Sequence, residues 1–128
     1  MLGADTDVAL DGEVLGKPRD AAHARDLLGR LAGRRHEVVG GIAVAEHGAI
    51  TVEDVVVTAV DFRALDPATI DWYVATGEWE GRAGGYAIQG KGAALVAGIE
   101  GDYLNVVGLP LARLLELCPA LLPSAPPR

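Results

Sequence analysis

One stretch near the start of the chain, residues 3–18, constrains the fold more than any other. It begins with residues typical of a β-strand, turns at Asp11-Gly12, a dipeptide that favours a tight hairpin turn, and returns toward Lys17. This arrangement would place the carboxylate of Asp5 and the ammonium group of Lys17 on neighbouring backbones. A carboxylate that orders a metal ion or a water molecule, beside a cation that holds an anion, suits phosphate chemistry.

The next part of the chain alternates between helical and strand patterns. Asp20 can cap a helix over residues 21–31, in which apolar residues recur at spacings of three and four. Residues 36–46 and 50–62 are rich in valine and are separated by His47-Gly48, which predicts an antiparallel hairpin. Both faces of the second strand are partly apolar, so we expect a strand inside a sheet that is covered on both faces.

A glycine-rich segment, residues 81–92, separates the last elements from the rest. Before it, a helix is predicted from Asp66, which can cap free amide groups, to Gly77. The glycines predict a loop that allows a ligand to approach the backbone closely. Two elements are predicted to follow: a hairpin over residues 93–99 and 103–107, and a helix over residues 109–118.

Length and composition predict a single domain, and the alternation of helical and strand patterns along the chain places that domain in the α/β class. The chain has 128 residues, of which 50% are hydrophobic, enough to bury one core. No internal repeat or linker divides it, so we expect one domain over residues 1–118. Residues 119–128 contain four prolines, and we expect this tail to be disordered.

Charge and cysteine content limit which binding partners and which cellular compartment we expect. A net charge of −7 argues against binding to a nucleic acid polymer, whose phosphates attract a basic surface. It leaves room for a single nucleotide, because a divalent ion can neutralise a carboxylate and a triphosphate together. Cys118 alone cannot form an internal disulfide, and no apolar run approaches the length of a membrane span. We therefore expect a soluble, cytoplasmic protein that does not bind membranes.

Four ordered motifs carry a family resemblance. They are Gly-Ala-Asp-Thr at residues 3–6, Leu-Gly-Lys-Pro-Arg-Asp at 15–20, Arg-Ala-Gly-Gly-Tyr-Ala-Ile-Gln-Gly at 82–90 and Asn-Val-Val-Gly-Leu-Pro-Leu at 105–111. Together they resemble the Maf family, the septum-formation-inhibitor-like nucleotide pyrophosphatases. Members open with a Ser-x-Ser-Pro-Arg-Arg loop that is absent before residue 3 here. The resemblance implies a shortened form of that fold, a mixed twisted sheet with flanking helices that is similar to inosine-triphosphate pyrophosphatases.

The resemblance also implies a reaction and a role for each of five residues. The reaction is hydrolysis of a nucleoside triphosphate, dTTP or UTP by preference, to the monophosphate and pyrophosphate, with Mg²⁺ as cofactor. Asp5 matches the proton acceptor for the attacking water and is a candidate metal ligand, and Thr6 matches a position associated with substrate choice. Lys17 and Arg82 would hold the triphosphate. Gln89 would read the edge of a pyrimidine base.

Each of these residues also has a structural interpretation. Asp5 could cap a turn, and Thr6 could be an ordinary strand residue. Lys17 and Gln89 could be solvated side chains of surface loops. For the whole chain, two alternatives to an active enzyme stay open: a non-catalytic nucleotide-binding or cell-division-linked interaction protein, and a fragment that works only when paired with another copy.

The shortened fold predicts association between copies. A sheet of this family that begins at residue 3 would have an open edge and an uncovered apolar patch, both of which favour a homodimer. We expect the partner to cover four apolar residues of the opening segment: Val8, Leu10, Val14 and Leu15.

Several polar side chains are interpreted as surface groups. The three histidines, His23, His36 and His47, are dispersed and lack the spacing of metal ligands. Glu78 and Glu80 precede the glycine-rich loop, and we expect them to face solvent rather than to position magnesium.

Overall fold

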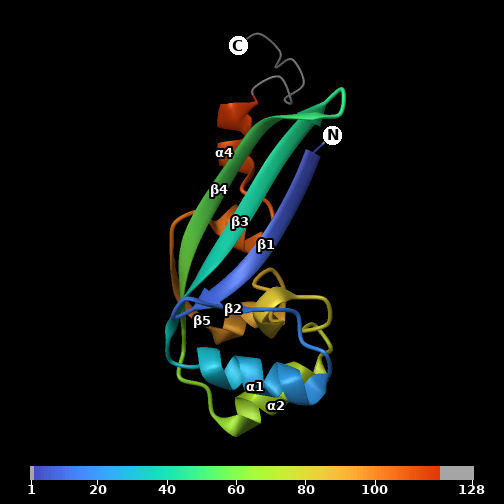
Figure 1. Ribbon diagram of the computed structural model, residues 1–128. Helices are drawn as coiled ribbons and strands as arrows, with labels where there is room; N and C mark the ends of the chain where they lie inside the picture. Colours follow the sequence, from blue (N-terminus) through green and yellow to red (C-terminus); the bar gives the residue numbers. More distant parts are fainter. Residues whose placement is uncertain (1, 119–128) are drawn as a thin grey trace.

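The computed structural model describes residues 2–118, which form one sheet with helices packed against it (Figure 1). The strands are β1 (Leu2–Leu10), β2 (Glu13–Leu15), β3 (Arg35–Glu46), β4 (Ala49–Phe62) and β5 (Val96–Glu100). The helices are α1 (Ala21–Leu31), α2 (Pro67–Ala75), α3 (Tyr103–Val107) and α4 (Leu111–Leu117), with 3₁₀ turns η1 (Ala83–Gly85) and η2 (Lys91–Leu95). Within this part of the chain, none of the helices is long and apolar enough to cross a membrane. The tail predicted to be disordered, residues 119–128, lies outside the described residues.

The sheet has the order β2-β1-β3-β4-β5, and each neighbouring pair is antiparallel. The predicted α/β class is confirmed, but the sheet is antiparallel rather than mixed over the described residues. Both predicted turns are present: Asp11-Gly12 joins β1 to β2, and His47-Gly48 joins β3 to β4. In each turn both central residues have positive φ, which matches the right-handed twist of the strands.

The sheet is covered on one face. Alternate residues of β3, including Val38 and Ile42, are buried under helices and loops, and Val60 of β4 points to the same side. On the opposite face Val55 and Val57 have exposed fractions of 59% and 50%. The prediction that β4 is covered on both faces is therefore wrong, because every helix packs on the same side of the sheet.

Local capping sets the starts of α1 and α2, as predicted. The Asp20 carboxylate accepts a hydrogen bond from the His23 N–H at 2.7 Å, and Asp66 accepts one from the Thr69 N–H at 2.7 Å. In Figure 1 these two helices lie together beyond one end of the long strands, while α4 lies along the other end. The leucines of α1 form the centre of the larger core cluster: Leu27, Leu28 and Leu31.

Residues 103–107 form helix α3, whereas the sequence predicted a hairpin strand. Asp102 caps this helix by accepting hydrogen bonds from the N–H groups of Leu104 and Asn105. The buried Asn105 amide then donates to the carbonyl oxygens of Val38 and Val56, both at 3.0 Å. The β-branched residues of this segment favour a strand, but the cap and the buried amide bonds outweigh that preference.

Gly40 makes room for the Asn105 side chain. A Cβ atom added at Gly40 would overlap Asn105 Oδ1, so any larger residue would push the amide away from its two strand carbonyls. The adjacent Gly41 has no heavy atom within 4 Å of an added Cβ. Of these two successive glycines of β3, only Gly40 lies where a larger side chain would not fit.

His36 lies in the core, so its interpretation as a surface group is wrong. Its exposed fraction is 2%, its Nε2 atom lies 2.6 Å from the Tyr86 hydroxyl, and its ring packs edge-on against Phe62. Burial disfavours the charged imidazolium and lowers the pKa of His36 to about 4. Burial also raises the pKa of Tyr86. At neutral pH both side chains are therefore uncharged.

The surface predicted to be covered by a partner is mostly core. Val8, Leu10 and Leu15 are at most 3% exposed because α1 and the loops cover them, and Val14 alone is exposed. The homodimer itself stays a prediction, but this surface is not available for it.

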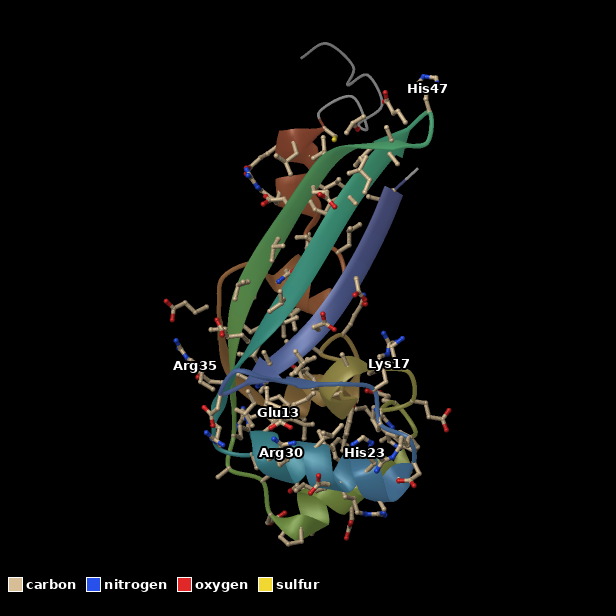
Figure 2. The ribbon with its side chains drawn as sticks, viewed as in Figure 1. Glu13, Lys17, His23, Arg30, Arg35 and His47 are labelled. Carbon is tan, nitrogen blue, oxygen red and sulfur yellow. The ribbon has the colours of Figure 1, made fainter. Side chains whose placement is uncertain are left out.

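Ion pairs join the elements at the end of the sheet where β3 begins; Figure 2 labels Arg35, Glu13 and Arg30 there. Arg35 of β3 donates to both carboxylate oxygens of Asp61 on β4, at 2.9 and 3.0 Å, and to Glu100 of β5 at 3.0 Å. Glu13 of β2 pairs with Arg30 of α1. These side chains are largely exposed, so each pair contributes little to stability.

Replacing Gly40 tests the close approach of Asn105. We expect Gly40→Ala to lower the free energy of unfolding by about 1–3 kcal/mol, because the added methyl group displaces a buried hydrogen-bonded amide. Gly41→Ala, with open space around it, is the matched control and should change stability by less than about 0.5 kcal/mol. Urea unfolding of the two variants measures the difference. Equal stabilities would show that Asn105 does not need the space.

Buried His36 predicts how stability depends on pH. An unfolded histidine takes up a proton below about pH 6.5, whereas folded His36 does so only near pH 4. The unfolded state therefore binds more protons in this window, and the free energy of unfolding should fall by an amount on the order of 3 kcal/mol as pH drops from about 6.5 to 4. Urea titrations across this range should show the slope in wild type and in His47→Gln, which changes the exposed histidine of the hairpin turn. His36→Gln should flatten it; an unchanged slope would contradict the assignment.

Candidate functional site

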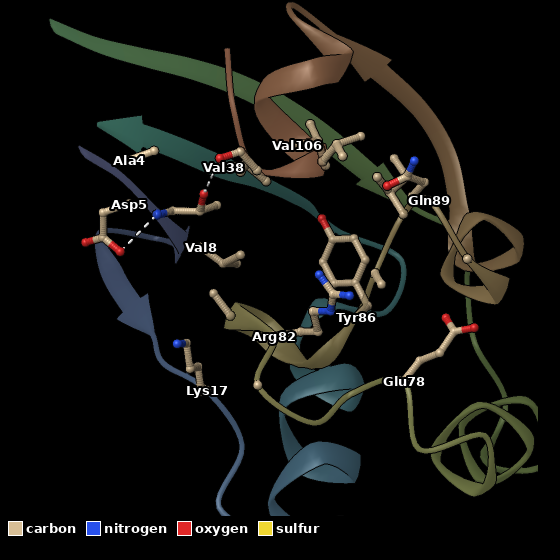
Figure 3. A pocket seen from close by; sticks show the side chains of 18 residues that line it. Ala4, Asp5, Val8, Lys17, Val38, Glu78, Arg82, Tyr86, Gln89 and Val106 are labelled. Atoms are coloured by element: carbon tan, nitrogen blue, oxygen red, sulfur yellow. Dashed lines mark hydrogen bonds between the residues drawn. The ribbon is translucent and has the colours of Figure 1, made fainter. Parts of the chain in front are cut away.

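A pocket opens where β1, the segment after β2 and the glycine-rich loop meet on the covered face of the sheet (Figure 3). Its cavity of about 510 Å³ is in the range of small-ligand sites. The five residues proposed from the sequence all line it: Asp5, Thr6, Lys17, Arg82 and Gln89. The fold thus brings together side chains from distant parts of the chain. The role of each of these side chains stays a prediction.

Gly84 is the point at which the loop meets the strand. Its φ of +73° favours glycine, and a Cβ atom there would lie 3.0 Å from Val8 Cγ2 of β1. The Gly84 N–H donates to the carbonyl oxygen of Gly16 at 3.2 Å. Because Arg82 and Lys17 are near neighbours of these glycines in sequence, the same contact brings both cations to the pocket.

Two cations of the pocket are available to bind an anion. Neither Lys17 nor Arg82 forms an ion pair with any residue of the described segment, and both are exposed. By contrast, five arginines elsewhere are paired with carboxylates: Arg25, Arg30, Arg34, Arg35 and Arg113. A phosphate group would therefore meet two cations without having to displace a carboxylate of the protein.

Asp5 and Thr6 are adjacent on β1 and differ in orientation. Thr6 is half-buried, and its hydroxyl donates to the carbonyl oxygen of Gly108, after α3, at 3.4 Å. The Asp5 carboxylate is exposed and accepts a hydrogen bond from the Thr6 N–H at 3.0 Å. Asp5 also borders a second hollow on the open face of the sheet, beside Gly41 and Val55. Because side chains alternate along a strand, Asp5 points to the open face, opposite Thr6, and it borders the pocket only at the rim, where water has access.

The sequence predicted that Glu78 faces solvent, but in the structure its carboxylate is bound by other groups of the protein. Its Oε1 atom accepts a hydrogen bond from the Tyr73 hydroxyl at 3.1 Å, and its Oε2 atom accepts one from the Lys91 N–H at 3.0 Å. The Lys91 amide is the main reason why the pKa of Glu78 is lowered, so the carboxylate is ionised at neutral pH. Burial raises the pKa of Tyr73 to about 12.

The carboxylates of the pocket limit how a metal could bind. Among residues 2–118 no group of three or more histidine, cysteine, aspartate or glutamate side chains is arranged to hold a metal ion. Glu78 already accepts backbone N–H groups, so Asp5 is the pocket carboxylate with room for a cation. Mg²⁺ binds well through one protein carboxylate when substrate phosphates and water supply its other ligands. The residues present therefore fit a metal that arrives with a phosphorylated substrate.

The two ends of the pocket differ in chemistry. In Figure 3, Asp5 and Lys17 lie toward one side, Gln89 and Glu78 toward the other, and Arg82 lies between them. The first side offers a carboxylate and a cation, and the second an amide with both donor and acceptor groups beside the carboxylate of Glu78, which is engaged by backbone N–H groups. This polarity suits a ligand that has a charged end and a hydrogen-bonding end.

Sequence reasoning missed two tyrosines that shape the pocket. Tyr86 lines it from within the glycine-rich motif, which was the signal that could have identified it. Tyr73 lies in the helix predicted from Asp66 to Gly77, and its hydroxyl accepts a hydrogen bond from the Ala87 N–H at 2.9 Å. These partners are 14 residues apart, and no local pattern connects them.

Comparison with known proteins agrees with the motifs. The family described as Maf-like protein matches residues 1–121. A dTTP/UTP pyrophosphatase of Anaeromyxobacter sp. (strain Fw109-5) is 55% identical over 121 residues, which cover 91% of this chain and 59% of that protein. Those of Pyrococcus furiosus and Moorella thermoacetica are 49% and 56% identical, over 91% of this chain and 61% of each relative. The chain thus spans about three fifths of the length of these curated relatives.

Proposed function

The chain belongs to the Maf family, and on this premise we propose that it hydrolyses nucleoside triphosphates, with preference for dTTP and UTP, to the monophosphate and pyrophosphate. The curated relatives named above support the choice of substrate. The observation that carries the proposal is the pocket itself, in which Lys17 and Arg82, unpaired within residues 2–118, lie with the exposed carboxylate of Asp5.

In the proposed reaction, the charged side of the pocket binds the triphosphate. Lys17 and Arg82 hold phosphate oxygens and stabilise the negative charge that develops as the bond between the α and β phosphates breaks. Asp5 orients the attacking water and accepts its proton, since the carboxylate is exposed at the mouth where water enters. A divalent metal, for which we propose Mg²⁺, would be held by Asp5 and phosphate oxygens and would neutralise part of the substrate charge.

The other side of the pocket would hold the base. The Gln89 side chain is exposed on the pocket wall and takes part in no recorded hydrogen bond within residues 2–118. Its amide can donate to a pyrimidine carbonyl and accept from the ring N–H of thymine or uracil. Thr6, whose hydroxyl is held by Gly108, contributes to substrate choice from the β1 side.

The predictions of a cytoplasmic location and of a homodimer belong to this proposal. Cys118 is a free thiol, which agrees with a reducing compartment. The opening segment is buried, so we propose that a homodimer would instead form through the open face of the sheet, where Val55 and Val57 are exposed.

Replacing Asp5 tests the catalytic role. With dTTP and Mg²⁺, we expect Asp5→Asn to reduce the rate of pyrophosphate release by about a hundredfold or more, because the amide cannot accept the proton of the attacking water. Asp7→Asn is the matched control: it is exposed on the same face of β1 but does not line the pocket. It should retain activity, and both variants should unfold at the wild-type urea concentration. Equal losses in the two variants would remove Asp5 from this role. Absence of pyrophosphate from every common triphosphate would instead favour a non-catalytic nucleotide-binding protein.

Replacing Gln89 tests base selection. We expect Gln89→Ala to reduce kcat/KM for dTTP and UTP by about 10- to 100-fold, corresponding to about 1–3 kcal/mol for unpaired polar groups, and to affect dATP and dGTP less. Steady-state assays with the four substrates measure the change in selectivity. Equal losses for all bases would show that Gln89 only maintains the loop.

A further inference from the structure

We propose that Glu78 and Tyr73 are positioning residues that fix the loop of residues 87–92 and thereby determine where Gln89 meets the base. This inference rests on the proposed function, since it assigns base selectivity to side chains that do not themselves touch the base. It would explain why an ionised carboxylate is held beside a pocket for an anionic substrate.

Glu78 and Tyr73 together bind three backbone amides of the loop. The Tyr73 hydroxyl accepts from the Ala87 N–H at 2.9 Å and donates to Glu78 Oε1 at 3.1 Å. Glu78 then accepts from the N–H groups of Lys91 at 3.0 Å and Gly92 at 3.3 Å. The amides bound in this way lie on both sides of Gln89, so the two side chains close the loop around it.

The loop has glycines where the carboxylate needs space. A Cβ atom added at Gly90 would lie 2.6 Å from Glu78 Oε1, which is too close for any side chain. A Cβ atom at Gly92 would overlap the carbonyl oxygen of Ala87, so the turn can close tightly only with glycine there. The closed, Glu78-bound form of the loop therefore requires glycine at both positions for lack of space, and not for backbone flexibility.

Glu78 is itself held firmly at the end of α2. Its N–H donates to the Thr76 hydroxyl at 3.1 Å, and that hydroxyl donates to the Tyr73 carbonyl oxygen at 2.6 Å. Gly77 turns the chain at a φ of +76°. Tyr73 is fully buried. The loop is thus attached through Glu78 to the rigid core and not to another loop.

Gln89 depends on this attachment. It is exposed, whereas the preceding Ile88 is 5% exposed and anchored in the core. On its other side the backbone up to Gly92 is held by turn hydrogen bonds and by the amides that Glu78 binds, as far as residues 2–118 show. An exposed amide can select a base only if its backbone is held within about 0.5 Å of the productive position. Ile88 holds the backbone before Gln89, and Glu78 holds the backbone after it.

The negative charge of Glu78 adds a second effect on orientation. It lines the pocket on the Gln89 side, whereas Lys17 lies on the opposite side, near Asp5 (Figure 3). A triphosphate would be repelled from the Glu78 side and attracted to the Lys17 side. The base end of the nucleotide would accordingly be directed to Gln89.

The test compares Glu78→Gln with Glu80→Gln in the full chain. Both changes remove one carboxylate charge, but Glu80 is exposed, does not line the pocket and has no recorded side-chain hydrogen bond within residues 2–118. The amide introduced by Glu78→Gln would oppose its own N–H₂ group to one of the backbone N–H groups of the loop. Tyr73→Phe loosens the same loop without a change of charge, because it removes the hydroxyl that accepts the hydrogen bond of the Ala87 N–H.

Two measurements on each variant separate positioning from folding. Amide hydrogen exchange at Lys91 and Gly92 in the free protein should accelerate by about tenfold or more in Glu78→Gln, while exchange in the core strands is unchanged. Binding of α,β-methylene dTTP, which cannot be cleaved at that bridge, should weaken by about tenfold or more, and binding of α,β-methylene dGTP by much less. Tyr73→Phe should shift selectivity in the same direction, and Glu80→Gln should match wild type.

Each contrary result has a distinct meaning. Unchanged exchange at Lys91 and Gly92 in Glu78→Gln would overturn the closure of the loop by Glu78. Faster exchange with unchanged selectivity would overturn its effect on Gln89. If wild type binds the analogues but releases no pyrophosphate from dTTP, the proposed hydrolysis fails while the positioning role is still decided by exchange and binding.

Discussion

The contact between Gly84 and Val8 is the constraint on which the site depends. It brings the glycine-rich loop so close to β1 that a Cβ atom at Gly84 would crowd the Val8 side chain, and the Gly84 N–H also binds the backbone that carries Lys17. The glycine-rich loop therefore meets two segments of the opening hairpin that lie far from it in the sequence. Each of the three segments contributes a different functional group: a carboxylate from β1, an ammonium group from the segment after β2 and a guanidinium group from the loop.

The distribution of charge follows from this meeting point. The protein is acidic overall, with a net charge of −7, and five arginines outside the pocket are paired with carboxylates. Within residues 2–118 the pocket cations Lys17 and Arg82 form no ion pair, and of the two pocket carboxylates Asp5 lies on the side of Lys17 and Glu78 on the side of Gln89 (Figure 3). A polyanionic ligand is thus attracted to one place on a surface that otherwise repels it, and a divalent ion would extend that attraction to the Asp5 side.

Polar groups in the covered layer hold the fold in one arrangement. The Asn105 amide ties α3 to the carbonyls of β3 and β4, and Glu78 ties α2 to the loop around Gln89. In both cases a glycine opposite the polar group leaves the space that it occupies: Gly40 for Asn105 and Gly90 for Glu78. The buried Asn105 amide would be costly without partners, and the partly buried Glu78 carboxylate forms charge-assisted hydrogen bonds, so these contacts favour one position of each segment over others.

The sequence by itself determined the features that depend on neighbours in the chain. Asp20 and Asp66 cap their helices through bonds that span three residues, and Asp11-Gly12 and His47-Gly48 turn the chain because their backbones accept positive φ. The motifs also identified the family and the five residues that the pocket brings together. Only the tertiary structure decided that one face of the sheet stays open, that His36 is buried, that residues 103–107 are helical and that Glu78 binds the loop. Each of these depends on contacts between distant segments, whose energies exceed local preferences and leave no periodic pattern in the sequence.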